Sequence, residues 1–171
     1  MGKTVPEILE NAKSAVQAKA DVVEWRVDWY EDVISFECVE HVLCKLREIA
    51  GEIPLLFTFR TLQEGGEQAI DVAAYRELNE KAARTKMADL IDAELSAGEE
   101  TVKSLIKTAH TFGVKVVVSN HDFEKTPSKE EIVARLRKMQ ELGADLPKIA
   151  VMPQCRKDVL TLLRATLEMA Q

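Results

Sequence analysis

Short runs of apolar and β-branched residues alternate along the chain with longer stretches in which apolar residues recur every three or four positions. The five short runs are Asp21–Asp28, Leu55–Arg60, Asp89–Leu95, Val114–Phe123 and Pro147–Met152. The intervening stretches have the spacing of amphipathic helices, for example Val39, Val42, Leu43, Leu46 and Ile49. The pattern predicts strands alternating with helices, which implies a parallel sheet covered by helices.

Residues typical of helix ends support this division. Three hydroxyl–carboxylate pairs have the spacing of a capping box: Thr4 with Glu7, Ser96 with Glu99, and Ser128 with Glu131. Glycines follow helical stretches where a left-handed residue is favoured, at Gly51, Gly113 and Gly143. We therefore expect strand–helix units along the whole chain.

The polar residues of the five runs favour a barrel-type sheet over an open doubly wound one. No glycine-rich phosphate turn follows the first run. Side chains alternate across a strand, so residues two apart share a face. The residues that share one face are Glu24, Arg26 and Asp28; Thr58 and Arg60; Asp92 and Glu94; Ser119 and His121; and Lys148 with Ala150 and Met152. Barrel active sites form at the carboxyl ends of the strands, where these polar residues gather. The alternative is a solvated face of an open sheet.

Lys148 lies within the otherwise apolar or proline-containing segment Leu146–Met152. A lysine in such a strand loses hydration, which favours the neutral amine. A neutral amine beside a ketone forms an imine. The alternative is a lysine that is ion-paired or extends to solvent; pairing with Asp92 would be one such arrangement.

His121 ends the fourth run on the same face as Ser119 and is a candidate to transfer protons. His41 and His110 fall on predicted helices. Arg26 and Arg60 present forked donors suited to a carboxylate or to hydroxyl groups, and either could pair with Glu24. A divalent-metal site is the weaker alternative, because its candidate ligands lack a recognised spacing. Those ligands would be Asp28, Glu94, His121 and Asp122.

Composition narrows the function classes. The 171 residues carry a net charge of −6, with 46% hydrophobic and 30% charged residues, so we expect one globular domain over 1–171. Acidity without a basic cluster argues against nucleic acid, and the absence of a long apolar run or signal-peptide pattern argues against a membrane. We interpret Cys38, Cys44 and Cys155 as reduced, buried small residues. A cytoplasmic setting is expected.

The motifs and their order resemble type I 3-dehydroquinate dehydratase over essentially the whole chain. The motifs are Glu24-Trp25-Arg26-Val27-Asp28, Phe57-Thr58-Phe59-Arg60, Glu64-Gly65-Gly66-Glu67, Ser119-Asn120-His121-Asp122-Phe123 and Pro147-Lys148-Ile149-Ala150. The resemblance implies a (β/α)8 TIM barrel, usually dimeric. It implies a lyase of the shikimate pathway, and so of aromatic amino acid biosynthesis. That lyase dehydrates 3-dehydroquinate to 3-dehydroshikimate with no metal and no cofactor.

The resemblance also implies roles for individual residues. Lys148 matches the lysine that forms a Schiff base with the substrate ketone, and His121 matches the histidine that carries protons. Glu64 matches a carboxylate that orients this histidine. The residues that match substrate-binding positions are Glu24, Arg26 and Arg60.

A complete barrel of this type has eight strands and about 250 residues. By resemblance we expect a partial barrel of about five strands and six helices, truncated at both ends and lacking the strands that would be first, seventh and eighth. Unpaired edge strands would favour a homodimer or other self-association. Two alternatives to a working dehydratase stay open. One is a catalytically impaired or inactive fragment that only self-associates. The other is a different imine-forming barrel lyase, such as a class I aldolase.

Overall fold

The computed structural model describes residues 1–170, in which five strands and six helices alternate. The strands are β1 (Val23–Arg26), β2 (Leu55–Thr58), β3 (Leu90–Glu94), β4 (Lys115–Asp122) and β5 (Leu146–Val151). The helices are α1 (Val5–Gln17), α2 (Phe36–Ala50), α3 (Val72–Thr85), α4 (Glu99–Thr111), α5 (Lys129–Leu142) and α6 (Arg156–Met169). The predicted alternation is confirmed.

Most strands are shorter than the predicted runs by two to four residues, and three of them lead directly or after a short loop into a turn of 3-10 helix. Short 3-10 helices follow the first three strands: η1 (Val27–Trp29), η2 (Leu62–Glu64) and η3 (Leu95–Ala97). Asp28 therefore lies in η1 and Glu64 in η2, beyond the ends of β1 and β2.

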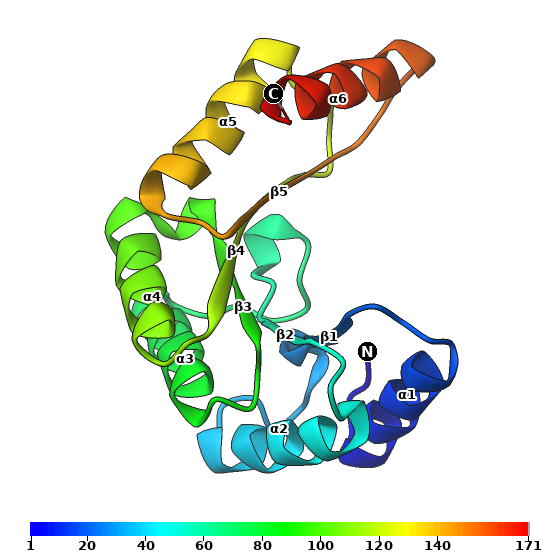
Figure 1. The fold of residues 1–171 in the computed structure, drawn as a ribbon, viewed down its shortest axis with the longest axis vertical. Coiled ribbons are helices and arrows are strands. Elements are labelled where there is room, and N and C mark those ends of the chain that lie inside the picture. Colours follow the sequence, from blue (N-terminus) through cyan, green and yellow to red (C-terminus); the bar gives the residue numbers. More distant parts are fainter. Residues whose placement is uncertain (171) are drawn as a thin grey trace.

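The sheet is parallel throughout, and its strand order is β1-β2-β3-β4-β5. A doubly wound sheet reverses its strand order at a switch point. Within residues 1–170 there is no such reversal, so the barrel-type arrangement is confirmed. Figure 1 shows the strands along the inside of a C-shaped arc, with the helices on the outside.

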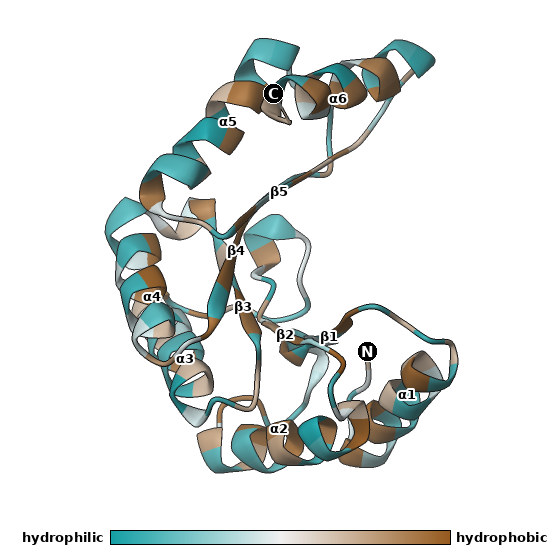
Figure 2. Ribbon diagram, viewed as in Figure 1, coloured by the Kyte–Doolittle hydropathy of each residue, from teal (hydrophilic) through white to brown (hydrophobic). Residues whose placement is uncertain are grey.

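The main hydrophobic core lies between the strands and the helices. Trp25, Phe57, Phe59 and Ile91 point to this outer side of the sheet and are at most 3% exposed. The Trp25 ring meets the Phe57 ring edge-on, with 5.7 Å between centroids. In Figure 2 the strands inside the arc are largely hydrophobic, whereas hydrophilic and hydrophobic residues alternate along the helices around them, as expected for amphipathic helices.

The inner face of the sheet has two layers. Near the amino ends of the strands, Leu56, Leu90 and Val117 form a small separate apolar cluster. Further along β2, β3 and β4 the residues on this face are polar and include Thr58 and Ser119, both fully buried. The apolar cluster thus closes the inner face on the amino-end side of the polar layer.

One of the three predicted capping boxes forms in full and a second forms in part. Thr4 and Glu7 form the box at α1. At α5 Ser128 accepts the N–H of Glu131, whereas the Glu131 side chain bonds Arg135. The prediction for Ser96 is wrong. Gly98 precedes α4 instead, and the Ser96 hydroxyl donates to Glu64 at 2.6 Å.

Several apolar side chains of α6 are exposed. Leu160, Leu163 and Leu167 are 54%, 58% and 64% exposed. Within the described residues β1 and β5 each have one neighbouring strand, so each leaves one edge open.

The prediction that all three cysteines are buried is wrong, since Cys38 and Cys44 are half-buried and Cys155 is exposed. Among residues 1–170, no helix has the length and apolar character needed to cross a membrane.

Candidate active site

The polar residues predicted to share a face do lie on the inner side of the sheet. In a parallel sheet, residues paired in register point the same way. Arg26 pairs in register with Thr58, and Ser119 pairs with both Glu94 and Lys148. Polar side chains of all five strands therefore face the concave side of the arc. The alternative of a solvated face is wrong for the polar residues at its centre, which are at most 3% exposed: Asp28, Thr58, Arg60, Glu64, Asp92, Glu94 and Ser119.

Arg60 is at the centre of this inner face and is surrounded by carboxylates. Its guanidinium lies 3.0 Å from Asp92, 2.8 Å from Glu94 and 3.6 Å from Glu64. Burial alone would lower the pKa of Arg60, but Asp92 and Glu94 outweigh it and raise the pKa. The expected pairing of Asp92 with Lys148 is therefore wrong, because Arg60 reaches from the end of β2 to this acid on the neighbouring β3. The pairing of Arg60 with Glu24 is wrong for the same reason.

The two carboxylates beside Arg60 differ in how fully they are bonded. Glu94 accepts from Arg60, from the Thr61 N–H at 2.9 Å and from the Thr61 hydroxyl. Burial nevertheless raises the pKa of Glu94. Asp92 accepts from Arg60 and Ser119 through Oδ1, whereas its buried Oδ2 has no hydrogen-bond partner in the part of the chain that is described. Asp92 thus keeps an unused acceptor inside the site.

Glu64 and His121 form a tight pair at the carboxyl end of β4. The His121 Nδ1 atom lies 2.8 Å from Glu64 Oε2, which also accepts the His121 N–H at 3.1 Å. Burial would raise the pKa of Glu64, but hydrogen bonds from His121 and Ser96 outweigh it and lower the pKa. A carboxylate at Glu64 can only accept, so it takes the Nδ1 hydrogen of His121, and in a neutral imidazole the lone pair is then on Nε2.

Two glycines bring Glu64 into position. Gly65 has a φ of +80°, and a Cβ there would lie 2.5 Å from the Phe123 ring. A Cβ at Gly66 would lie 1.8 Å from the carbonyl oxygen of Arg60. Only glycine fits either place, so the Glu64-Gly65-Gly66-Glu67 segment folds tightly over β2 and toward β4.

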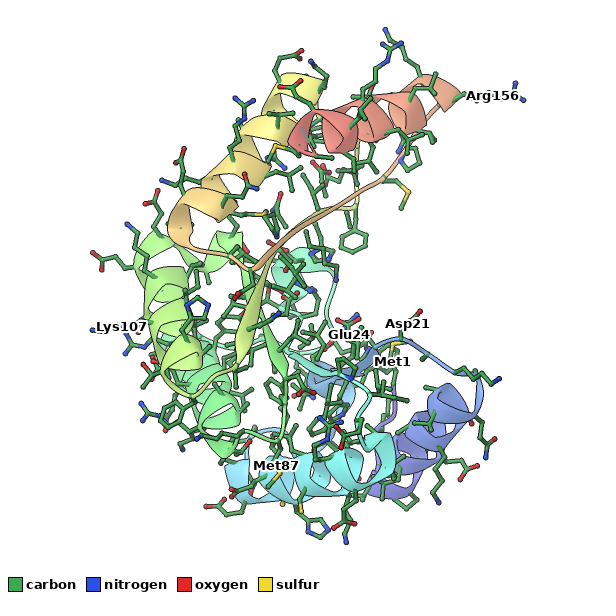
Figure 3. All side chains as sticks on the ribbon, viewed as in Figure 1. Met1, Asp21, Glu24, Met87, Lys107 and Arg156 are labelled. Carbon is green, nitrogen blue, oxygen red and sulfur yellow. The ribbon has the colours of Figure 1, made fainter. Side chains whose placement is uncertain are left out.

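Arg26 and Glu24 lie at the β1 end of the site. Arg26 donates to both oxygens of Asp28, at 2.7 and 2.8 Å, and this pairing raises the pKa of Arg26. The two bonds use Nε and Nη2, which leaves the remaining guanidinium nitrogen for a ligand. Glu24 accepts from the Thr58 hydroxyl at 2.8 Å and is exposed. It is labelled on the concave side of the arc in Figure 3. The expected Glu24–Arg26 pair is replaced by Arg26–Asp28.

Lys148 lies on β5, on the same face as Ser119 and His121, and is half-buried. Among residues 1–170, its ammonium makes no ion pair or hydrogen bond with the protein. The alternative of an ion-paired lysine is therefore wrong. Its amine is available to a molecule in the concavity.

Three of the four candidate metal ligands are paired with other side chains. Asp28 holds Arg26, Glu94 holds Arg60, and His121 holds Glu64. Over the described part of the chain, no three side chains of His, Cys, Asp or Glu are grouped so as to hold a metal ion.

Four further residues support the site in roles that the sequence pattern did not predict. The buried Tyr75 hydroxyl accepts the N–H of Glu94 at 3.0 Å, and burial raises its pKa well above the usual value. Ser96 and Asn120 bond to Glu64, and Arg135 bonds to Asn120. Tyr75, Ser96 and Arg135 lie on helices or turns, and Asn120 points to the helix side of β4. Alternation along a strand predicts only which strand residues face the inner side, so it does not identify these four.

This fold and site define an α/β protein of the barrel type, with a free lysine and a carboxylate-held histidine on its inner face. A family model described as type I 3-dehydroquinase matches residues 1–171. The chain belongs to this family, as its motifs indicated.

Relatives and solved structures agree with this assignment. The chain is 54% identical over 168 residues to a 3-dehydroquinate dehydratase of Clostridium botulinum, an alignment that covers 98% of this chain and 66% of that protein. It is 53% identical over 171 residues to one of Klebsiella pneumoniae, covering 100% and 68%. The structure matches a type I 3-dehydroquinate dehydratase of Clostridium difficile, solved with covalently modified comenic acid, with a TM-score of 0.97 and 53% identity. That match covers 99% of this chain and 67% of the other.

Proposed function

We propose that this chain carries the Schiff-base site of a 3-dehydroquinate dehydratase, a lyase that converts 3-dehydroquinate to 3-dehydroshikimate. The observation that carries the proposal is the arrangement of one unpaired lysine and one histidine, held by Glu64, on the same concave face. Family membership and the relatives' names support the same reaction.

Lys148 is the proposed nucleophile. Its amine nitrogen attacks the ketone carbon, and the carbonyl oxygen leaves as water to give a protonated imine. The absence of an acid partner for Lys148 supports this role, because a paired carboxylate would stabilise the ammonium over the neutral amine that attacks a ketone. The positive imine nitrogen then acts as an electron sink for the neighbouring carbon.

His121 is the proposed proton carrier. With the hydrogen on Nδ1 facing Glu64, its Nε2 atom can take a proton from the carbon next to the imine. The C–H electron pair moves into the imine and gives an enamine. Return of this pair expels the hydroxyl group of the next carbon, which leaves as water with the proton from His121. Hydrolysis of the imine releases the product and restores Lys148.

Glu24, Arg26 and Arg60 are proposed to hold the substrate, but their surroundings suit different tasks. Glu24 is exposed, and Arg26 has a guanidinium nitrogen to spare, so both can meet hydroxyl or carboxylate groups. Arg60 is 3% exposed and committed to three acids, so its contribution is mainly to fix those acids in place.

Intact-protein mass after incubation with 3-dehydroshikimate and borohydride tests the proposal, because borohydride converts an imine into a stable amine. We expect a gain of one reduced ligand in the natural chain and none in Lys148→Ala. Lys115→Ala is the matched control, since Lys115 is an exposed lysine at the start of neighbouring β4. No gain in a folded natural chain, or an equal gain in Lys148→Ala, would contradict the proposed site.

A second candidate is a chain that self-associates without turnover. It is favoured by the open edges of β1 and β5 and by the exposed leucines of α6. We expect a dimer or larger species in sedimentation at micromolar concentration, and a shift toward monomer in a Leu163→Glu, Leu167→Glu variant. Ile34→Glu, at a 94% exposed position between β1 and α2, is the control and should leave the size unchanged. A monodisperse monomer of the natural chain would rule out self-association.

A further inference from the structure

The position of His121 depends on Glu64, and Glu64 is itself held at both oxygens. Its Oε2 atom faces His121, as described above, while Oε1 accepts from the Ser96 hydroxyl at 2.6 Å and from the Asn120 amide nitrogen at 3.4 Å. Asn120 precedes His121 on β4, so one strand supplies both the histidine and a donor to its carboxylate.

An asparagine amide can present either its nitrogen or its oxygen to a neighbour, so the direction of Asn120 must be fixed by something else. Arg135 of α5 fixes it. Its Nη1 atom donates to Asn120 Oδ1 at 2.9 Å. A guanidinium has only donors, so it can bond only to the oxygen of the amide. This bond turns the NH2 group of Asn120 toward Glu64.

Arg135 is itself held in place on the helix surface. Its other terminal nitrogen donates to Glu131, one turn earlier on α5, and its side chain is 28% exposed. A continuous row of hydrogen bonds therefore runs from the outside of α5 through Asn120 to Glu64 and His121.

We infer that Arg135 is a positioning residue for His121, acting through the orientation of the Asn120 amide and of Glu64. Its effect on turnover rests on the proposed function, whereas its effect on the histidine ring does not. The side chain of Arg135 bonds Asn120 and Glu131 and makes no bond to Lys148, so we expect imine formation to be unchanged when Arg135 is replaced.

The first test observes the His121 ring by NMR, with the Nδ1 hydrogen assigned by comparison with His121→Gln. In Arg135→Met we expect this hydrogen to exchange with water about three to ten times faster, the range that one hydrogen bond is worth. Asn120→Asp keeps the bond from Arg135 but turns an acceptor toward Glu64, so its effect should be larger still. Arg137→Met is the matched control, because Arg137 is an exposed arginine of the same helix that pairs with Glu168 at 3.3 Å.

The second test measures turnover and borohydride trapping in the same variants. We expect kcat to fall about three- to ten-fold in Arg135→Met with KM unchanged, and Arg135→Lys, which keeps a donor, to recover part of the loss. Trapping at Lys148 should be equal in all variants and in the natural chain.

The outcomes separate the two proposals. If the natural chain forms no imine, the proposed function fails, and the exchange of the His121 hydrogen still decides the role of Arg135. If exchange is unchanged in folded Arg135→Met and Asn120→Asp, or if Arg137→Met changes it equally, the role assigned to Arg135 is overturned.

Discussion

The two ends of the parallel strands use the same kinds of charged side chain in different ways. At the amino ends, Asp89 accepts the N–H of Leu55 at 2.8 Å and faces Arg47 at 2.6 Å, and Asp145 accepts the N–H of Val116 at 2.9 Å. Each of these acids joins a neighbouring strand to a base on a helix, His110 in the case of Asp145. These groups fasten strands to helices, although the Nε atom of Arg47 is itself buried without a hydrogen-bond partner among the described residues.

At the carboxyl ends, charged residues of five strands converge and some bonding capacity is left over. Asp92 Oδ2 is buried without a hydrogen-bond partner, and the half-buried Lys148 amine forms no ion pair with the described residues. Leaving the Asp92 oxygen without a donor costs free energy, and a ligand that donates to it would offset that cost. The acids at the amino ends fasten strands to helices, whereas the unused acceptor and amine at the carboxyl ends face the site where we propose that a ligand binds.

Removing Arg60 should have the largest effect, because it would leave three buried carboxylates without their cation. We expect Arg60→Met to lower the free energy of unfolding by about 3–5 kcal/mol, measured by urea denaturation. Arg84→Met, which removes an exposed arginine 4.0 Å from Glu80, is the control and should change it by less than about 1 kcal/mol. Similar losses in the two variants would mean that the central cluster contributes no more than a surface pair.

Removing Asp89 should lower the free energy of unfolding by a smaller amount and should leave borohydride trapping at Lys148 unchanged. Asp89→Ala leaves the N–H of Leu55 and the guanidinium of Arg47 without their acceptor, which costs about 1–3 kcal/mol in urea denaturation. Borohydride trapping at Lys148 should be unchanged under conditions where the variant is folded. A loss of trapping in folded Asp89→Ala would break the distinction between the two ends.

The smallest expected effect is on the stability of the fold at low pH. Burial would raise the pKa of Asp145, but hydrogen bonds from His110 and the Val116 N–H outweigh it and lower the pKa. A carboxyl whose pKa is lower in the folded than in the unfolded chain stabilises the fold above the unfolded value of about 4 and loses this contribution as the pH falls through the folded value.

Asp145→Asn should therefore be less stable than the natural chain near pH 6, with the gap narrowing toward pH 3. Urea denaturation at a series of pH values measures this. A constant gap over that range would show that Asp145 contributes through packing rather than through its charge.

Strand and helix positions, and the face that each strand residue occupies, could be predicted from the sequence. These depend on periodicities of two and 3.6 residues, which are local. For example, Glu24, Arg26, Thr58, Asp92, Ser119, His121 and Lys148 all lie on the expected face.

The partners of those residues could not be predicted, because they depend on the curvature of the sheet and on side-chain reach. Arg60 crosses from β2 to the acids of β3 and takes Asp92, which sequence reasoning had paired with Lys148. Ser96 was expected to cap α4, and a local pattern cannot reveal that Glu64, 32 residues earlier, competes for its hydroxyl. Arg135 lies on the outside of a helix, where an ion pair with Glu131 is the ordinary expectation.

The sequential strand order described above also bears on how the chain reaches its fold. Every strand pairs with the strand that comes next in the sequence, and every pairing is parallel. No step in building this sheet waits for a strand from a remote part of the chain. The sheet can therefore grow from its amino end in the order of synthesis, each new unit covering the edge left by the one before it.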